Sequence, residues 1–262
     1  MDGWGFGPWQ RCQLFVGSAA AQGARSILHF DQYDNLFVQL SGTKRFRIFD
    51  PQQTAALYPY PVHHPLDTRA QVDLEQPDLE VFPDLARARG TEIVLGPGQT
   101  LFLPATWWHE VVTEPVPDGQ VTVSVNFWFA STARLLSPTL PLVPSMRVEL
   151  ARQLEYLVSD SMDDKARHVP KFLAGLLTGL ACAESCAPDQ AGEQGGDEAR
   201  LAAAHAALDR TRPHDVDPGT WHGLFEFVAW KLAALVGATQ AAPFARDLCS
   251  PARFEQLRLH GQ

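Results

Sequence analysis

The feature that most constrains the fold of this chain is a histidine and an aspartate two positions apart, His29 and Asp31, inside the apolar run 26–31. Strand side chains repeat every two residues, so a strand here would direct both side chains to the same face. Together they would form half of a metal site. The remaining ligand must come from a distant segment, so the pattern predicts that two remote stretches of the chain meet.

His109 is the best candidate for that ligand because it closes the strand-like run 101–104 and follows two bulky residues, Trp107 and Trp108. Two nitrogens and one carboxylate oxygen on one side of an ion leave its other positions open for substrates. This arrangement is typical of non-haem Fe(II) oxygenases. The His–Asp pair by itself is a weak signal, because a satisfied, half-buried histidine is the commoner reading. We expect the tryptophans to pack rather than to take part in chemistry.

Alternating apolar and polar residues predict a β-rich fold around these ligands. The predicted strands are residues 13–17, 35–40, 44–49, 93–95, 101–103 and 121–128. A turn at Gly42 joins two of them in what we interpret as a β-hairpin. In the last strand Thr122, Ser124 and Asn126 share one face, so Asn126 can point into the interior. A buried amide that satisfies backbone groups is an equally good interpretation of Asn126.

Lys44 opens the strand that follows the Gly42 turn, one hairpin away from the candidate ligands. A lysine at a strand start is usually a solvated turn residue. Here a cation could also pair with a dianionic cosubstrate such as 2-oxoglutarate. Asn35 begins the preceding strand, where it is as well suited to capping a turn as to touching a ligand.

Taken together, these segments resemble the JmjC-type cupin oxygenases that use Fe(II) and 2-oxoglutarate, especially the asparaginyl hydroxylases typified by factor inhibiting hypoxia-inducible factor. The resemblance is strong over residues 3–130 and weak over 145–177. It is carried by Leu28-His29-Phe30-Asp31, Gly42-Thr43-Lys44-Arg45, Leu57-Tyr58-Pro59-Tyr60-Pro61-Val62-His63-His64-Pro65, Gly96-Pro97-Gly98, Trp107-Trp108-His109 and Val125-Asn126-Phe127-Trp128. It implies a mainly β fold, a double-stranded β-helix or jelly-roll core, followed by a C-terminal α-helical region.

The resemblance also implies roles for particular residues. The catalytic iron ligands are expected to be His29, Asp31 and His109. The residues expected to hold 2-oxoglutarate are Lys44, Ser26, Asn35 and Asn126, with Lys44 and Ser26 at its far carboxylate. The implied reaction hydroxylates a protein side chain and converts 2-oxoglutarate to succinate and CO2. The rigid, aromatic segment 58–65 would suit a wall for an extended peptide substrate.

Three interpretations of the function remain open. The first is a protein hydroxylase acting on asparagine or another side chain. The second is a JmjC lysine demethylase or an RNA hydroxylase, which would share the iron chemistry, and the third is a non-catalytic cupin used for binding. The net charge of −9 and a pI near 5.4 argue against nucleic acid as a partner, because binding a phosphate backbone needs clustered Lys and Arg.

The four cysteines are too few and too scattered for a disulfide framework, so we expect a reducing compartment, cytoplasmic or nuclear. The spacing of Cys182 and Cys186 would fit half of a zinc site, but no second pair lies nearby, and free thiols are the better interpretation. The first residues lack a basic region followed by an apolar core, so we expect no signal peptide. No apolar run approaches the length of a membrane span.

These patterns predict four regions. Residues 1–135 form the catalytic core, ahead of which the resemblance implies further sequence. Residues 140–182 form a helical hairpin that, by the resemblance, is a possible homodimer contact, and a monomer in light scattering would remove this expectation. Residues 183–198 read as a linker. Residues 199–262 form a helical extension with helices near 198–210 and 219–237, whose aromatic residues we expect to be buried.

Overall fold

The structure is a computed structural model, and it describes residues 6–17, 24–117, 120–132, 140–162, 166–185, 193–255 and 257. The chain divides into two compact units, which we describe separately. Unit 1 comprises Met1–Tyr60, Pro65–Thr139 and Pro144–Val148, and unit 2 comprises Pro61–His64, Leu140–Val143 and Glu149–Gln262. Within the described ranges, no helix is both long enough and apolar enough to cross a membrane.

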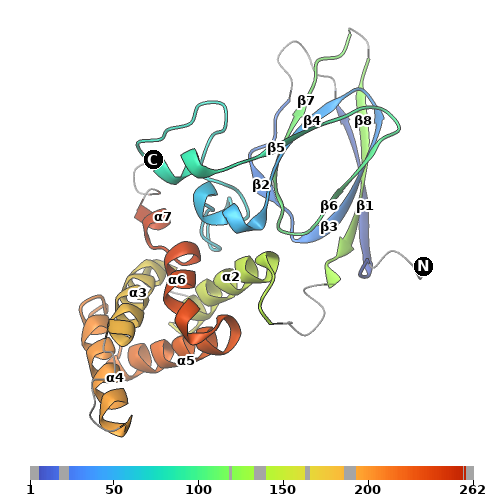
Figure 1. Ribbon diagram of the computed structural model, residues 1–262. Helices are drawn as coiled ribbons and strands as arrows, with labels where there is room; N and C mark the ends of the chain where they lie inside the picture. The colour runs from blue at the N-terminus through green and yellow to red at the C-terminus, as the bar shows by residue number, and fades with distance from the viewer. Residues whose placement is uncertain are drawn as a thin grey trace. The chain divides into compact units, whose positions relative to one another are not determined.

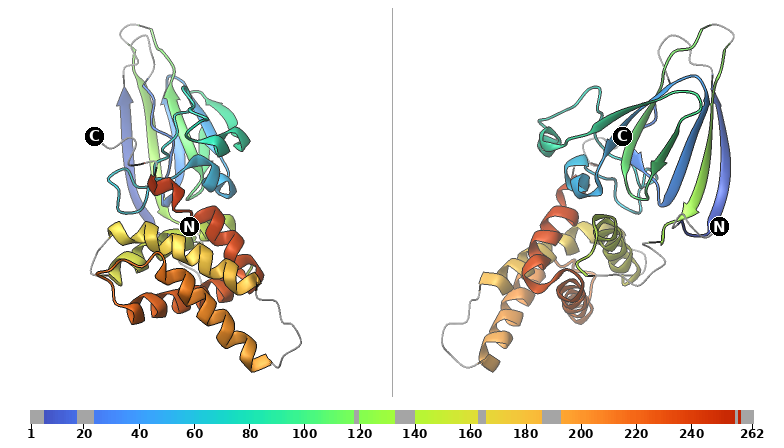
Figure 2. Two further views of the ribbon diagram at one scale, coloured as in Figure 1. Left: turned by 90° about the vertical axis from the view of Figure 1, so that its left-hand side faces the viewer. Right: turned by 45° about the vertical axis from the view of Figure 1, so that its right-hand side comes forward.

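Unit 1 is built from two antiparallel sheets of four strands that face each other (Figure 1, Figure 2). The first sheet has the order β1-β8-β3-β6 and the second the order β2-β7-β4-β5. The strands are β1 Trp9–Gly17, β2 His29–Phe30, β3 Tyr33–Ser41, β4 Lys44–Phe49, β5 Thr91–Leu95, β6 Thr100–Leu103, β7 Trp108–Thr113 and β8 Thr122–Ala130. The predicted mainly β core followed by helices is confirmed.

The predicted β-hairpin at Gly42 is wrong, although both of its strands exist. β3 pairs with β6 and β8, whereas β4 pairs with β5 and β7 in the opposite sheet. The turn therefore crosses from one sheet to the other. Gly42 has φ +72, and a Cβ there would lie 2.4 Å from Thr122 Oγ1, so only glycine fits. Alternation in the sequence identifies a strand but does not choose its partner.

The ligand strands also differ from the expectation. β2 is only His29–Phe30, and Asp31 lies just beyond its end rather than within a longer strand. His109 does not close the run 101–104, because a turn containing Thr106 (φ 67) separates β6 from β7, and His109 is the second residue of β7. The amide of Thr106 donates to the carbonyl of Asp31 over 2.8 Å. This bond ties the turn before β7 to the end of β2.

Two hydrophobic clusters hold unit 1 together. One lies between the sheets around Phe37 of β3 and Phe46 of β4. The other includes Phe30, Trp108 and residues of the long connection 50–90, which contains the 3-10 helices η1 Pro51–Leu57 and η2 Pro83–Arg87. Trp108 is fully buried, and its indole N–H donates to Thr54 Oγ1 over 2.9 Å. This agrees with the packing role expected of Trp108.

Unit 2 is helical. Its elements are most of α2 Pro144–Asp160, then η3 Ala166–His168, α3 Val169–Ser185, α4 Glu193–Asp209, α5 Pro218–Val236, α6 Ala238–Leu248 and α7 Ala252–Glu255. Asp217 caps α5 by accepting from the amide of Thr220 over 2.9 Å, with Pro218 in the first turn. Inside the unit, the buried carboxylate of Glu155 in α2 accepts from the guanidinium of Arg253 in α7.

Three expectations for the helical region need correction. We expected α2 and α3 to pair as a hairpin over 140–182, but α3 packs most extensively along α4. Helices occupy both ends of the expected linker 183–198, and residues 186–192 lie outside the described residues. Trp221 of α5 is buried as expected, whereas Phe227 and Trp230 on the same helix are exposed. A helix has several faces, and composition alone does not say which one is covered.

Three cysteines fall among the described residues, and none of them forms a disulfide bond there. Cys12 is exposed, Cys182 is half-buried and Cys249 is buried. Burial raises the pKa of the Cys249 thiol to about 12, so it stays protonated. Cys186, the other half of the spacing considered for zinc, lies outside the described residues.

Candidate metal centre

His29 and His109 lie directly opposite each other where β2 pairs with β7. Residues directly opposite in an antiparallel pair direct their side chains to the same face. The two imidazole rings have centroids 4.3 Å apart, while the neighbouring pair, Phe30 and Trp108, belongs to the hydrophobic cluster that includes the connection 50–90. The short β2–β7 ladder thus separates a polar face, which carries the histidines, from an apolar one.

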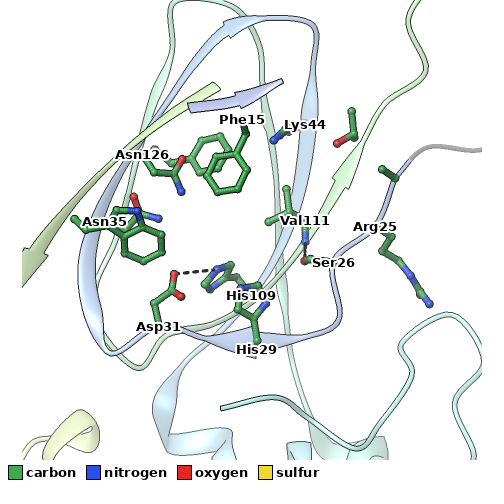
Figure 3. Close-up of a pocket in the computed structure, with 14 residues that line it drawn as sticks. Phe15, Arg25, Ser26, His29, Asp31, Asn35, Lys44, His109, Val111 and Asn126 are labelled. Carbon is green, nitrogen blue, oxygen red and sulfur yellow. Dashed lines mark hydrogen bonds and ion pairs between the residues drawn. The ribbon is translucent and has the colours of Figure 1, made fainter. Parts of the chain in front are cut away.

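Asp31 completes the group from the residue after β2. One ligand atom from each of His29, Asp31 and His109 lies within 4.8 Å of the others. Asp31 Oδ2 is 3.6 Å from His109 Nε2 (Figure 3), which is too long for a hydrogen bond. The three atoms therefore converge on one point without bonding to one another, as the ligands of an ion do.

Backbone carbonyls fix the tautomers of both histidines. His29 Nδ1 lies 2.7 Å from the carbonyl oxygen of Ile27, and His109 Nδ1 lies 3.0 Å from that of Trp107. A carbonyl can only accept, so each Nδ1 carries the proton and each Nε2 keeps a lone pair. Metal-bound histidines commonly donate their second nitrogen to a carbonyl in this way.

Burial sets the charges of the three groups. It lowers the pKa of His29 to about 4, with the neighbouring His109 adding to the effect, and it lowers the pKa of the fully buried His109. Burial raises the pKa of Asp31 to about 6. At neutral pH the site therefore offers two neutral imidazoles and a carboxylate that is mostly ionised, which is the protonation state that metal binding requires.

The three candidate ligands open into a pocket of about 320 Å³ between the sheets. All seven residues predicted for the site line this one pocket: Ser26, His29, Asp31, Asn35, Lys44, His109 and Asn126. Figure 3 shows Lys44 at the end of the pocket away from the three candidate ligands. Sequence-distant residues expected to act together are thus brought together by the fold.

Lys44 is a half-buried cation among aromatic rings. Its ammonium lies 5.0 Å from the ring centroid of Phe37 and 5.6 Å from that of Phe15, and it donates to Ser124 Oγ over 3.0 Å. Burial lowers the pKa of Lys44. Among the described residues it has no carboxylate partner, so its charge is available to an anion in the pocket.

The remaining pocket residues supply polar atoms. Asn35 Oδ1 and Asn126 Oδ1 are buried and accept no hydrogen bond from the described residues. Ser26 Oγ accepts from the amide of Val111 over 2.9 Å, so its own hydroxyl proton is free to donate. Buried polar atoms without partners are rare in folded proteins and mark a place where a polar ligand fits.

Three residues of the site were not predicted from the sequence: Ser124, Phe15 and Trp128. Ser124 holds Lys44, and Phe15 and Trp128 form walls of the pocket. The signal for Ser124 and Trp128 was present, because β8 alternates and both share the face of Asn126. No such signal identified Phe15, because the sequence predicted the strand β1 but did not indicate which of its side chains point into the interior.

This donor set fits a divalent transition metal with an organic dianion beside it. Two imidazole nitrogens and one carboxylate are the facial arrangement found in non-haem iron sites. The uncompensated ammonium of Lys44 and the hydroxyl of Ser26, whose proton is free to donate, lie in the same pocket and suit a dicarboxylate.

Residues 7–134 match the profile of a family described as the cupin-like domain. This range contains both sheets and the complete candidate metal centre.

Curated relatives match this region. The chain is 38% identical over 122 residues to HSPB1-associated protein 1 of Mus musculus, which covers 45% of this chain and 24% of that protein. It is 43% identical over 117 residues to the HSPB1-associated protein 1 homolog of Danio rerio, 44% of this chain and 24% of that protein. It is 36% identical over 108 residues to lysine-specific demethylase 8 of Xenopus tropicalis, 41% of this chain and 23% of that protein. The chain thus spans about a quarter of the length of these relatives.

Proposed function

We propose that this protein is an Fe(II)- and 2-oxoglutarate-dependent oxygenase that hydroxylates a side chain of another protein, as asparaginyl hydroxylases do. One observation carries the proposal: His29, Asp31 and His109 converge at one end of a pocket whose other end holds the uncompensated cation Lys44. An ion and a dianion are the two ligands that such a pocket accommodates together.

In this proposal His29 Nε2, His109 Nε2 and one oxygen of Asp31 hold the iron. When bound, iron and 2-oxoglutarate supply the oxidation, in which one atom of O2 enters the C–H bond of the substrate and the other enters succinate as CO2 is released. The carbonyls of Ile27 and Trp107 keep the two imidazoles in the orientation that ligation needs.

The other residues of the pocket orient the cosubstrate. Lys44 would pair with its far carboxylate, to which the hydroxyl of Ser26 would also donate. Ser124 restrains the ammonium of Lys44, so little side-chain freedom remains to be lost on binding. The side-chain amides of Asn35 and Asn126 would donate to oxygens of the cosubstrate, and Phe15, Phe37 and Trp128 would keep water away.

Lysine demethylation is the second candidate, because one of the similar proteins is named a lysine-specific demethylase. It would use the same metal and cosubstrate residues and would differ only in the group presented to the iron. Lysine is cationic, so the charges near the metal centre bear on whether a lysine or another side chain is presented to the iron.

The first test is succinate formation from 2-oxoglutarate by the purified protein with Fe(II) and oxygen, without any added target. We expect slow succinate formation in the wild type and none in His109→Ala. Equal succinate formation by both proteins would contradict the assignment of the ligand. Bound iron with no succinate formation in the wild type, even with peptides added, would favour a non-catalytic binding protein.

A further inference from the structure

Most arginines that the structure describes in unit 1 have partners. Arg25, Arg45, Arg47 and Arg87 pair with carboxylates of Asp73, Glu110, Glu92, Glu114, Glu75 and Asp84, and Arg89 donates to backbone carbonyls. Two others, Arg11 and Arg69, have no carboxylate partner among the described residues. Both stand against residues that line the pocket, Arg69 opposite His29 and Arg11 over the ring of Trp128.

Arg69 lies beside His29 in the same row of side chains as the histidine pair. The segment around Arg69 pairs antiparallel with β2, and Arg69 stands directly opposite His29. The flanking bonds are Ala70 N to Leu28 O at 2.9 Å and Phe30 N to Thr68 O at 3.0 Å. Side chains of directly opposed residues leave the same face. His109, His29 and Arg69 therefore form one row across three adjacent segments.

The neighbours of Arg69 support this orientation. Ala70 is buried in the hydrophobic cluster with Phe30 and Trp108, on the face opposite the histidines. Since side chains alternate along an extended segment, Arg69 must leave the polar face.

Arg11 approaches the centre from the other sheet. It stands opposite Trp128 where β1 pairs with β8, and its guanidinium carbon lies 5.4 Å from the ring centroid of Trp128, a wall of the pocket. Arg69 thus stands beside His29, and Arg11 stands against a pocket wall on the opposite sheet.

This charge pattern discriminates between substrates. The only carboxylate among the residues lining the pocket is Asp31, a candidate metal ligand. Lys44 and Arg25 line the pocket, and Arg69 and Arg11 stand against two other lining residues, His29 and Trp128. A lysine ammonium brought there would meet cations and no free carboxylate, whereas a carboxylate could gain charge-assisted hydrogen bonds from guanidinium groups. In a chain of net charge −9, cations left unpaired at one place are a specific feature rather than an excess of basic residues.

We propose that the substrate is an acidic peptide, in which an aspartate or glutamate side chain lies at or beside the hydroxylated carbon and its carboxylate binds Arg69 and Arg11. This inference rests on the proposed oxygenase function and names its substrate class. The reaction consumes O2 and 2-oxoglutarate and yields the hydroxylated residue, succinate and CO2.

The test uses two degenerate peptide pools that differ only at a central position, Asp and Glu in one pool and the near-isosteric Asn and Gln in the other. Turnover is measured as peptide-stimulated succinate and as oxygen incorporation by mass spectrometry. Binding of fluorescently labelled pools is measured separately by anisotropy with Mn(II) in place of iron. We expect the acidic pool to bind and to react at least about tenfold better, because a carboxylate accepts charge-assisted hydrogen bonds from guanidinium groups that a neutral amide accepts only weakly.

Substitutions of the two arginines test whether they cause the preference for acidic peptides. Arg69→Gln and Arg11→Gln should each weaken binding of the acidic pool about tenfold and leave the neutral pool unchanged. Neither variant should raise the KM for 2-oxoglutarate or lower the affinity for Mn(II), because removing a nearby cation does not weaken the binding of a metal ion. Arg69→Lys should restore part of the preference. Arg87→Gln removes the same charge from an exposed pair with Asp84 and serves as the matched control.

Different outcomes would contradict the acidic substrate and the oxygenase function. Equal binding of both pools, or a raised KM for 2-oxoglutarate in Arg69→Gln, would overturn the acidic substrate while leaving the oxygenase intact. Arginine-dependent binding of the acidic pool without succinate formation under any condition would overturn the oxygenase and leave acidic recognition standing.

Discussion

His29 and His109 face each other across the β2–β7 pair with their ring centroids 4.3 Å apart, and each donates its Nδ1 proton to a backbone carbonyl two residues earlier. Both Nε2 atoms are thereby left as acceptors beside Asp31. The local backbone, and not a further side chain, decides which nitrogen of each ring can bind an ion.

The first prediction concerns metal affinity. Asp31→Ala and His29→Ala should each reduce the affinity for Mn(II) or Fe(II) by more than about a hundredfold, because losing even a residue that only supports a ligand costs about 10–100-fold. Anaerobic calorimetric titration measures the change. His214→Ala, which removes an exposed histidine of unit 2, is the control and should bind as the wild type does. Unchanged affinity in Asp31→Ala would contradict the assignment of this ligand.

The second prediction concerns Lys44. Lys44→Met should raise the KM for 2-oxoglutarate about thirtyfold, since a hydrogen bond to a charged group contributes about 2 kcal/mol, while metal affinity stays constant. Lys44→Arg should raise it less, because the charge remains but the fork geometry differs. Kinetics of succinate formation at varied 2-oxoglutarate measure both variants. A change in metal affinity with no change in KM would show that Lys44 does not meet the cosubstrate.

The third prediction concerns the helical unit. Arg253→Met should lower the free energy of unfolding by about 3–5 kcal/mol, because it leaves Glu155 buried without its charged partner. The amide of Val62 also donates to Glu155 over 3.1 Å and cannot compensate a full charge. Urea denaturation followed by the helical circular-dichroism signal measures the effect. Arg246→Met, at an exposed position of α6, should change stability by less than about 0.5 kcal/mol, and equal effects of the two variants would refute the role of the pair.

The fourth prediction concerns pH. Arg25 donates to both oxygens of Asp73, at 3.0 and 3.1 Å, and this holds the pKa of the carboxyl below its ordinary value of 3.8. A lowered pKa in the folded state means that the stabilisation is fully present above the unfolded value and is lost as pH falls through the folded one. Between pH 5 and pH 2, Asp73→Asn should therefore show a shallower loss of stability than the wild type. Parallel stability curves would show that the pair contributes nothing, as is common for exposed pairs.

The candidate ligands could be found in the sequence because spacing and residue type encode them locally. The spacing of His29 and Asp31 and the bulky flank of His109 needed no knowledge of the partner strands. The alternation of β8 likewise placed Asn126 and Ser124 on one face, and the buried positions of that strand agree.

Partnerships between strands could not be predicted in this way. The Gly42 turn gives the local signal of a hairpin, yet the structure places β3 and β4 in opposite sheets, where each pairs with strands distant in sequence. Similarly, α3 packs mainly along α4 rather than along α2. Packing chooses among partners whose local patterns are equivalent.

The sequence by itself thus determined which residues could bind a metal and a dianion, because residue chemistry and strand periodicity are local properties. Only the tertiary structure decided that Arg69 stands in the histidine row and that Arg11 lies over Trp128, a wall of the pocket. Whether an arginine is paired or left unpaired depends on carboxylates distant in sequence, and their positions are set when the two sheets close on their common core.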